Sequence, residues 1–165
     1  MEAIFSTQRL QLNLITETDQ DFIIRLLNSD GWLQFIGDRN VHSTKDAIDY
    51  IQKIKNTADF FYWTVRLKAT DNAIGIISFL KRSYLDHFDI GFAFLPEFTG
   101  QGYAYEAAGK VLSILSKTNL YSTVLATTLP GNNKSVRLLT KLGFHFEKEI
   151  EMQLDTLHVY SNSTN

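Results

Sequence analysis

The residue types best suited to chemistry in this chain form a glycine-rich turn, Gly100-Gln101-Gly102, between two apolar segments. The first segment, Ile90 to Leu95, is typical of a strand, and the second, Tyr103 to Lys117, is typical of a helix. Glycines one residue apart allow a tight turn and leave its backbone amides uncovered. The first turn of the following helix adds unpaired N–H groups and the positive end of the helix dipole. The sequence therefore predicts a site for a phosphate or pyrophosphate at this junction.

Two well-known phosphate-binding motifs do not account for the turn. A P-loop requires a lysine followed by Ser or Thr after its last glycine, where this chain has Tyr103 and Ala104. The dinucleotide fingerprint requires a third glycine, where this chain has Tyr105. A tight strand-to-helix turn without any ligand explains the two glycines equally well, so the glycines alone leave the ligand open.

A second motif follows the chain break at Pro130-Gly131. Asn132 or Asn133 supplies an N-cap for a helix there. This helix runs to Leu142, and Gly143 ends it. The motif predicts a short helix with a polar start.

The composition excludes several classes of protein. The formal net charge of −2 gives no electrostatic case for binding nucleic acid or an anionic membrane. The absence of cysteine excludes disulfides, thiolate catalysis and cysteine-ligated zinc, and the four histidines show no metal-ligand spacing. The N-terminus, Met1 to Ser6, lacks the features of a signal peptide, and no apolar run approaches membrane-spanning length. We therefore expect a cytoplasmic protein without a metal.

The elements that hold these motifs alternate as in an α/β protein. The predicted strands are 10–14, 60–68, 73–81, 89–95, 121–129, 144–152 and 157–160. The predicted helices begin at 16–19, 43–44, 103 and 132–133. We expect Gly31 to Asn40 to be a loop and Ser161 to Asn165 to be frayed. No repeat or linker interrupts the chain, so residues 1–165 predict a single α/β domain with a mixed sheet of about seven strands and about four helices.

Four segments together resemble the GCN5-related N-acetyltransferase (GNAT) superfamily, in particular its RimJ/RimL-type branch of ribosomal-protein N-terminal acetyltransferases. They are similar to the family's opening strand, its cofactor-binding core, the motif that follows this core and the closing hairpin. In that order the segments are Ser6–Leu12, Ile90–Ala107, Asn132–Phe144 and Phe146-Glu147. The resemblance covers almost the whole chain and implies a GNAT-like fold whose central sheet splays at the cofactor site.

The resemblance also implies acetyl-CoA as the cosubstrate. The pantetheine arm would lie between the strand that ends at Phe94 and the strand that ends near Thr128. Phe92, Ala93 and Phe94 would pair with this arm like an added strand. Asn132 would hydrogen-bond the arm or the attacking amine. The pyrophosphate would lie on the backbone amides of Thr99, Gly100, Gln101, Gly102, Tyr103 and Ala104.

Two positions depart from the commonest pattern of the family. Glu97 stands where many members carry Gln or Arg, but the amino-terminal acetylase branch often carries Glu there, so we interpret it as a mark of that branch. Leu139 stands where many members use a tyrosine to protonate the departing thiolate. Ser135 is the predicted substitute, because some members of the branch are thought to use the matching serine. The alternative is that Ser135 only caps the helix.

The remaining candidates concern the amine. A lysine-like amine has a pKa of about 10.4 and an α-amine about 7.7–8.0, so a base matters more for the former, and positioning suffices for the latter. Asp89, where related chains often carry Glu, is the predicted base, with a solvated strand end as the alternative. The family's acceptor site implies substrate-binding roles for Trp32, Phe35 and Asp38, with Arg39 nearby. An aromatic wall with Asp38 suits a cationic substrate, whereas core aromatics on a loop are the alternative.

We therefore predict an acetyl-CoA-dependent N-acetyltransferase that acts on a protein N-terminal α-amine or a small-molecule amine by direct attack on the thioester. A non-catalytic acyl-CoA-binding or sensor protein of the same fold is the alternative, because Leu139 replaces the usual acid. No nucleic acid or membrane partner is expected. The protein is expected to be a monomer or a homodimer.

Overall fold

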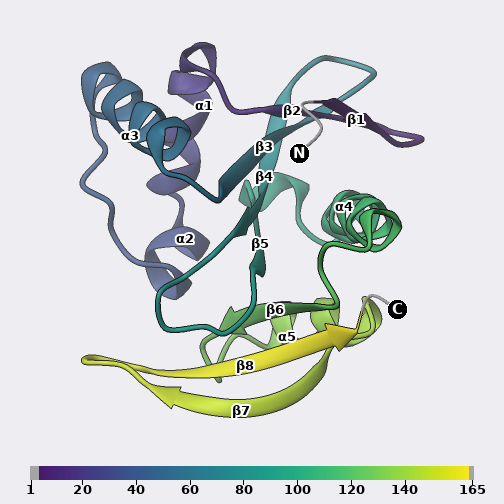
Figure 1. Ribbon diagram of the computed structural model, residues 1–165. Coiled ribbons are helices and arrows are strands. Elements are labelled where there is room, and N and C mark those ends of the chain that lie inside the picture. Colours follow the sequence, from purple (N-terminus) through teal and green to yellow (C-terminus); the bar gives the residue numbers. More distant parts are fainter. Residues whose placement is uncertain (1–3, 164–165) are drawn as a thin grey trace.

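The computed structural model describes residues 4–163 and shows an α/β protein built on one mixed sheet (Figure 1). The sheet has eight strands in the order β1-β2-β3-β4-β5-β6-β8-β7. The strands are β1 (Ile4–Ser6), β2 (Leu10–Leu14), β3 (Phe60–Leu67), β4 (Ala73–Leu80), β5 (Asp89–Phe94), β6 (Thr123–Thr128), β7 (His145–Glu151) and β8 (Thr156–Ser163). The helices are α1 (Gln20–Leu27), α2 (Asp30–Phe35), α3 (Thr44–Asn56), α4 (Tyr103–Thr118) and α5 (Asn133–Lys141), with two 3₁₀ turns, η1 (Glu17–Asp19) and η2 (Pro96–Phe98).

The helices form two layers on opposite faces of the sheet. Helices α1, α2 and α3 gather on one side of strands β2 to β5, and α4 lies on the other side (Figure 1). Each layer has its own cluster of buried side chains: Ile23, Ile51 and Ile76 belong to the first, and Trp63 and Val111 to the second. Because strand side chains alternate between faces, neighbouring residues of one strand serve different layers.

One row of side chains crosses the central strands on the face of α1, α2 and α3. Tyr62 in β3 is opposite Ser78 in β4, and Ser78 is opposite Gly91 in β5. A Cβ atom at Gly91 would lie 2.5 Å from the Ser78 hydroxyl oxygen, so only glycine allows this close approach. Because Gly91 has no side chain, this face of the sheet is recessed at that position.

Strands β5 and β6 are parallel and meet at a single point. Their one register pair is Asp89 with Leu125, supported by a 2.9 Å hydrogen bond from the Leu125 N–H to the Phe88 carbonyl. All other neighbouring strands are antiparallel, and β6 pairs with β8 along its whole length. Beyond Asp89 the two strands therefore diverge toward their C-terminal ends, as the predicted splay requires. We call the Asp89–Leu125 pair the apex of this opening.

The predicted α/β architecture is confirmed, and three local predictions are corrected. A strand at Ile4–Ser6 raises the strand number to eight, because it pairs with β2 over three residues. Part of the predicted loop Gly31 to Asn40 is helical, since α2 buries Trp32 and the Leu33 N–H donates to the Ser29 carbonyl at 3.0 Å. This helix raises the number of α-helices to five among residues 4–163.

The third correction concerns the C-terminal segment. Ser161 to Ser163 belong to β8 instead of fraying, because Ser161 pairs with both Leu125 and His145, and Ser163 pairs with Thr123. Residues 164–165, the end of the predicted frayed tail, lie outside the described residues, as do residues 1–3 of the N-terminal segment Met1 to Ser6. Within residues 4–163, none of the helices is both long enough and apolar enough to span a membrane.

Candidate active site

A cavity of about 830 Å³ follows the opening between β5 and β6. One end lies at the glycine turn, after the C-terminal end of β5, and the other lies at Asp89, where β5 begins. Between these ends, strand β5 alone spans five strand rises from Asp89 to Phe94, or roughly 17 Å at 3.3 Å per residue. The wall includes residues from α2, β3, β4, β5, β6, α4 and α5. The cavity therefore joins most of the predicted site residues in one continuous space.

The glycine turn has the backbone conformation that its sequence predicts. Gly100 and Gly102 have φ values of +76° and +82°, which side-chain-bearing residues rarely adopt. Gly102 is the N-cap residue of α4 and offers no side chain to the helix amides. The N–H groups of the first turn of α4 therefore face the cavity without a side-chain cap, as an anion site requires. Thr99, Gly100, Gly102, Tyr103 and Ala104 line the cavity, whereas Gln101 does not.

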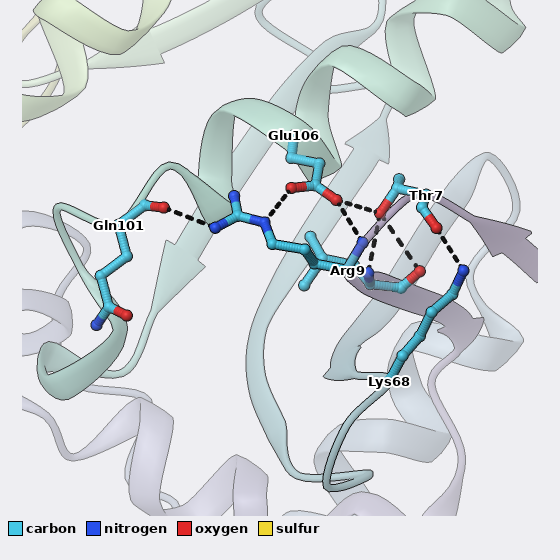
Figure 2. A network of polar contacts seen from close by, with 6 residues as sticks. Thr7, Arg9, Lys68, Gln101 and Glu106 are labelled. Carbon is cyan, nitrogen blue, oxygen red and sulfur yellow. Dashed lines mark hydrogen bonds and ion pairs between the residues drawn. The ribbon is translucent and has the colours of Figure 1, made fainter.

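A polar network holds the glycine turn against the start of β2 (Figure 2). Glu106, in the first turn of α4, accepts hydrogen bonds from the Thr7 hydroxyl (2.6 Å), the Arg9 backbone N–H (2.9 Å) and Arg9 Nε (2.7 Å). Arg9 Nη1 donates to the Gln101 carbonyl at 3.1 Å, and its guanidinium lies 4.4 Å from the centre of the Tyr103 ring. We call Thr7, Arg9 and Glu106 the brace.

The brace affects the ionisation of its carboxylate and was missed from the sequence. Partial burial raises the pKa of Glu106, but the hydrogen bonds from Thr7 and Arg9 outweigh burial and lower that pKa below its usual 4.5. Arg9 appeared in the sequence only as part of the opening strand. Nothing in the local pattern indicated a contact with a turn more than 90 residues away.

The hydrogen-bond register of β5 distinguishes between the three residues predicted to pair with pantetheine. The Leu95 N–H donates to the Ile74 carbonyl at 2.9 Å, so alternation directs the backbone groups of Ala93 toward β4. The backbone groups of Phe92 and Phe94 then point toward β6, where the opening leaves them without a partner strand. The register favours Phe92 and Phe94 over Ala93 as backbone partners for a ligand.

The start of α5 places two predicted residues at the cavity. Asn132 is the N-cap residue, and its Oδ1 accepts a 3.2 Å hydrogen bond from the Ser135 N–H. Capping is therefore performed by the Asn132 side chain, while the Ser135 hydroxyl has no hydrogen-bond partner among the described residues. Both residues line the cavity. Leu139, at the position of the missing tyrosine, is buried and contributes an apolar wall.

Helix α5 also carries three cations that the sequence analysis missed. Lys134, Arg137 and Lys141 line the cavity, and no carboxylate pairs with them among residues 4–163. Their spacing of three and four residues places them on one helix face, a signal that the sequence contained. Lys141 Nζ also lies 4.4 Å from the centre of the Tyr105 ring. This face adds positive charge to the side of the cavity formed by β6 and α5.

Asp89, the predicted base, lies at the apex and is 2% exposed, so it is not the solvated strand end considered above. Arg82 Nε donates to both of its carboxylate oxygens at 3.0 Å. Burial raises the pKa of Asp89, and the Arg82 charge opposes this rise. A carboxylate held by both oxygens in an ion pair is poorly placed to take a proton from an amine. Its role as a base stays a prediction that this geometry does not favour.

Two tyrosines and two arginines surround the apex on the face of α1, α2 and α3. The Arg39 charge acts on both phenols, and Tyr50 and Tyr62 lie close enough to affect each other's ionisation. Burial raises the pKa of both phenols, so they are neutral at pH 7. Both guanidinium groups, of Arg39 and Arg82, act electrostatically on Tyr62. We call the group formed by Arg39, Tyr50, Tyr62, Ser78, Arg82 and Asp89 the apex pocket.

The predicted acceptor residues divide into two groups. Trp32 and Phe35 line the cavity, and Trp32 Nε1 donates to the Gly37 carbonyl at 3.0 Å. Asp38 is exposed and absent from the cavity lining, because its Oδ1 accepts from the Asn40 N–H at 2.7 Å within the loop. The neighbouring residue Arg39, which has the opposite charge, lines the cavity instead of Asp38. The expected fit to a cationic substrate loses its main support.

Comparisons with known proteins agree with this geometry. Residues 9–145 match the family model described as an acetyltransferase (GNAT) domain. The chain belongs to the GNAT acetyltransferase family. It is 29% identical to the Bacillus subtilis (strain 168) N-acetyltransferase YoaA over 168 residues, which cover 99% of this chain and 92% of YoaA.

Solved structures confirm the GNAT fold. A putative ribosomal-protein-serine acetyltransferase from Vibrio cholerae superposes with a TM-score of 0.81 at 19% identity, over 99% of each chain. RimL, a ribosomal L7/L12 α-N-protein acetyltransferase in complex with coenzyme A, gives a TM-score of 0.83 at 15% identity, over 97% of each chain. The neighbours of this GNAT protein thus include ribosomal-protein acetyltransferases, in agreement with the predicted RimJ/RimL-type branch. As a family member the protein is an acyltransferase.

The part of the chain that the structure describes contains no group of three or more His, Asp or Glu side chains that could hold a metal ion.

Proposed function

We propose that this GNAT protein is an acetyl-CoA-dependent N-acetyltransferase that transfers an acetyl group to a primary amine, either a protein N-terminal α-amine or a small-molecule amine. The opening between β5 and β6, with the glycine turn at its end, carries the proposal. It offers unpaired strand backbone, uncapped helix amides and a continuous cavity, which together fit an elongated, phosphorylated thioester.

Acetyl-CoA would supply an acetyl group activated as a thioester. The residues of this chain would hold it by two kinds of contact. The backbone of Phe92 and Phe94 suits the amide groups of the pantetheine arm, and the amides from Thr99 to Ala104 suit the pyrophosphate. Lys134 and Arg137 on α5 would add charge for the phosphates.

Catalysis would depend mainly on positioning. An α-amine is neutral in roughly a tenth of molecules at pH 7, so a strong base is not required. Asn132 retains its side-chain N–H₂ group for the amine or the arm, because only Oδ1 is used in the cap. The Ser135 hydroxyl is the group best placed to protonate the departing thiolate.

The first experiment compares ligands by thermal unfolding. At about 100 times its Kd, acetyl-CoA should stabilise the protein by about 2.7 kcal/mol, whereas ATP and NAD should not. Release of free CoA is then followed with a panel of amines. The absence of any shift with acetyl-CoA would eliminate both the enzyme and a non-catalytic acyl-CoA-binding protein.

A second experiment separates these two alternatives. If Ser135 is the acid, Ser135→Ala should lower kcat by about 100-fold and leave the Kd for acetyl-CoA unchanged. Thr140→Ala is the matched control, because Thr140 lies on the same helix with an exposed hydroxyl that bonds only to the Val136 carbonyl. Cofactor binding without CoA release for any amine would favour the non-catalytic alternative, for which Leu139 is the main sequence evidence. The cytoplasmic location and the choice of monomer or homodimer remain predictions.

A further inference from the structure

We propose that the acceptor amine carries an anionic group, a carboxylate or a phosphate, and that the apex pocket holds this group. The inference rests on the proposed function, since it names the class of acceptor for the same reaction. It follows from the types of side chain that face the cavity at the apex and from the directions of their hydrogen bonds.

Arg82 is the first element of the anion site. Its Nε makes both contacts with Asp89, so its two Nη groups have no hydrogen-bond partner among the described residues. Asp89 is buried and fixes the plane of the guanidinium, while about a third of the Arg82 side chain remains exposed. A guanidinium fixed at one nitrogen presents the rest of its planar fork, the geometry that binds carboxylate and phosphate best.

Arg39 and the two phenols are the second element. Arg39 lines the cavity near the neutral phenols of Tyr50 and Tyr62, and it forms no ion pair with a carboxylate among residues 4–163. Tyr62 lines the cavity and is paired across the strands with Ser78, so its neutral O–H is a donor on the cavity wall. The pocket thus directs two cations and a phenol donor at one region, beside the Ser78 hydroxyl.

The pocket has too few carboxylates to pair with these donors. Asp89 is its one acidic side chain among the described residues, and the Arg82 ion pair occupies both of its oxygens. Asp30 also lines the cavity, but it is exposed in the first turn of α2, outside the apex pocket. A diamine would meet Arg39 and Arg82 as like charges, whereas an anionic group would satisfy donors that are otherwise unpaired.

Matched pairs of acceptors test the inference in a CoA-release assay at saturating acetyl-CoA. Three pairs differ only in the anionic group: γ-aminobutyrate against γ-aminobutyramide, phosphoethanolamine against ethanolamine, and the peptide amides Ala-Asp-Ala against Ala-Asn-Ala. Putrescine is the cationic comparison. In at least one pair, kcat/KM for the anionic member should exceed that of its neutral partner at least tenfold. The pair with the largest ratio identifies a small carboxylate, a phosphate or a peptide as the source of the anion.

Two variants connect this preference to the pocket. Arg39→Gln should reduce the ratio below about threefold through the acceptor KM, with the Kd for acetyl-CoA unchanged. Arg82→Lys keeps a cation beside buried Asp89 but removes the planar fork, and should reduce the ratio similarly. Lys53→Gln is the matched control, because it removes one exposed positive charge from α3.

The outcomes separate this inference from the proposed function. Turnover that favours neutral amines or putrescine, or a preference that survives in Arg39→Gln, would leave the acetyltransferase in place and overturn the anion site. If no amine is turned over, the proposed function fails, and calorimetric titration of the same pairs into the protein with and without CoA decides the inference. Tenfold tighter binding of the anionic member that requires Arg39 supports it, and equal binding overturns it.

Discussion

The glycine turn and the apex pocket lie at opposite ends of one cavity and are built in different ways. The glycine turn is one short stretch of chain whose ligand groups are backbone amides. The apex pocket collects side chains from six separate segments, namely Arg39, Tyr50, Tyr62, Ser78, Arg82 and Asp89. Binding by backbone amides depends little on which side chains the site carries. Such a site therefore suits a cosubstrate common to a family. A site built from side chains can change its ligand with a single substitution, which suits an acceptor that differs between members.

The largest test of this contrast is Gly102→Asp, which should raise the Kd for acetyl-CoA by more than 100-fold. A side chain there would be strained at φ +82°, its Cβ would lie 3.4 Å from Arg9 Nη2, and its carboxylate would repel phosphate. Calorimetry measures the Kd, and circular dichroism checks the fold. Gly131→Asp is the control, because that position has open space and no positive φ. Normal affinity in a folded Gly102→Asp protein would remove the glycine turn from the site.

Loss of the brace should have a smaller effect on the same end of the cavity. Arg9→Ala removes the contacts with Glu106 and with the Gln101 carbonyl, so the turn is less well ordered before acetyl-CoA binds. We expect about a tenfold higher Kd for acetyl-CoA and an unchanged acceptor KM. Lys55→Ala is the control, because it removes a cation whose partly exposed ion pair with Glu17 joins α3 to η1. An altered acceptor KM with normal cofactor binding would contradict the role of the brace.

The brace also predicts a pH dependence. Because folding lowers the pKa of Glu106 below 4.5, its contribution to stability is complete above that pH and is lost as the pH falls through the lower folded value. Chemical denaturation should therefore show Glu106→Gln less stable than the parent by about 1 kcal/mol at pH 7, with the difference shrinking below pH 4.5. A difference that stays constant down to pH 3 would show that the charge of Glu106 does not matter.

At the apex, Tyr62→Phe should weaken the binding of the acceptor amine and not that of acetyl-CoA. It removes a donor and leaves the ring, so we expect a three- to fivefold higher acceptor KM with the Kd for acetyl-CoA unchanged. Tyr160→Phe, which removes a phenol hydroxyl from a side chain outside the cavity lining, is the control. Weaker acetyl-CoA binding in Tyr62→Phe would indicate that the glycine turn and the apex pocket do not bind their ligands independently.

The smallest effect is expected for Glu97, which departs from the commonest family pattern near the glycine turn. Glu97 forms a 2.8 Å ion pair with Arg25, and both side chains are more than half exposed. Glu97→Gln should change the free energy of unfolding by less than about 1 kcal/mol and the Kd for acetyl-CoA less than twofold. A larger change in that Kd would place Glu97 in the cofactor site.

The same contrast explains what could be predicted from the sequence. Glycines, caps and apolar periods act over a few residues, so the glycine turn, the Asn132 cap and the α/β order were predicted. The short helix α2 was missed because six residues give too little periodicity to distinguish from a loop. The polar end of β8 was missed because Ser161 to Ser163 are ordered by two neighbouring strands and not by their own type.

Contacts set by the path of the folded chain account for the remaining errors. Arg9 could not be predicted to contact Gln101, because only the fold brings together residues 92 positions apart. Arg82 reaches Asp89 because of the path of the loop between β4 and β5, which the local pattern does not reveal. Asp38 and Arg39 are neighbours in the chain, and the direction of the loop after α2 decides which one reaches the cavity. The family resemblance placed both residues in the acceptor region, but only Arg39 lines the cavity.

The single register pair at the apex also has a consequence for cooperativity. β1 to β5 and the group β6-β8-β7 are two hydrogen-bonded ladders that meet only at Asp89 and Leu125. We expect native-state hydrogen exchange to resolve them as two units, with the β6-β8-β7 amides opening at a lower free energy than those of β3 and β4. A ligand that completes the ladder along Phe92 and Phe94 would link the units, so bound acetyl-CoA should bring both to a common opening free energy. The cosubstrate would then act as a missing strand of the protein that binds it.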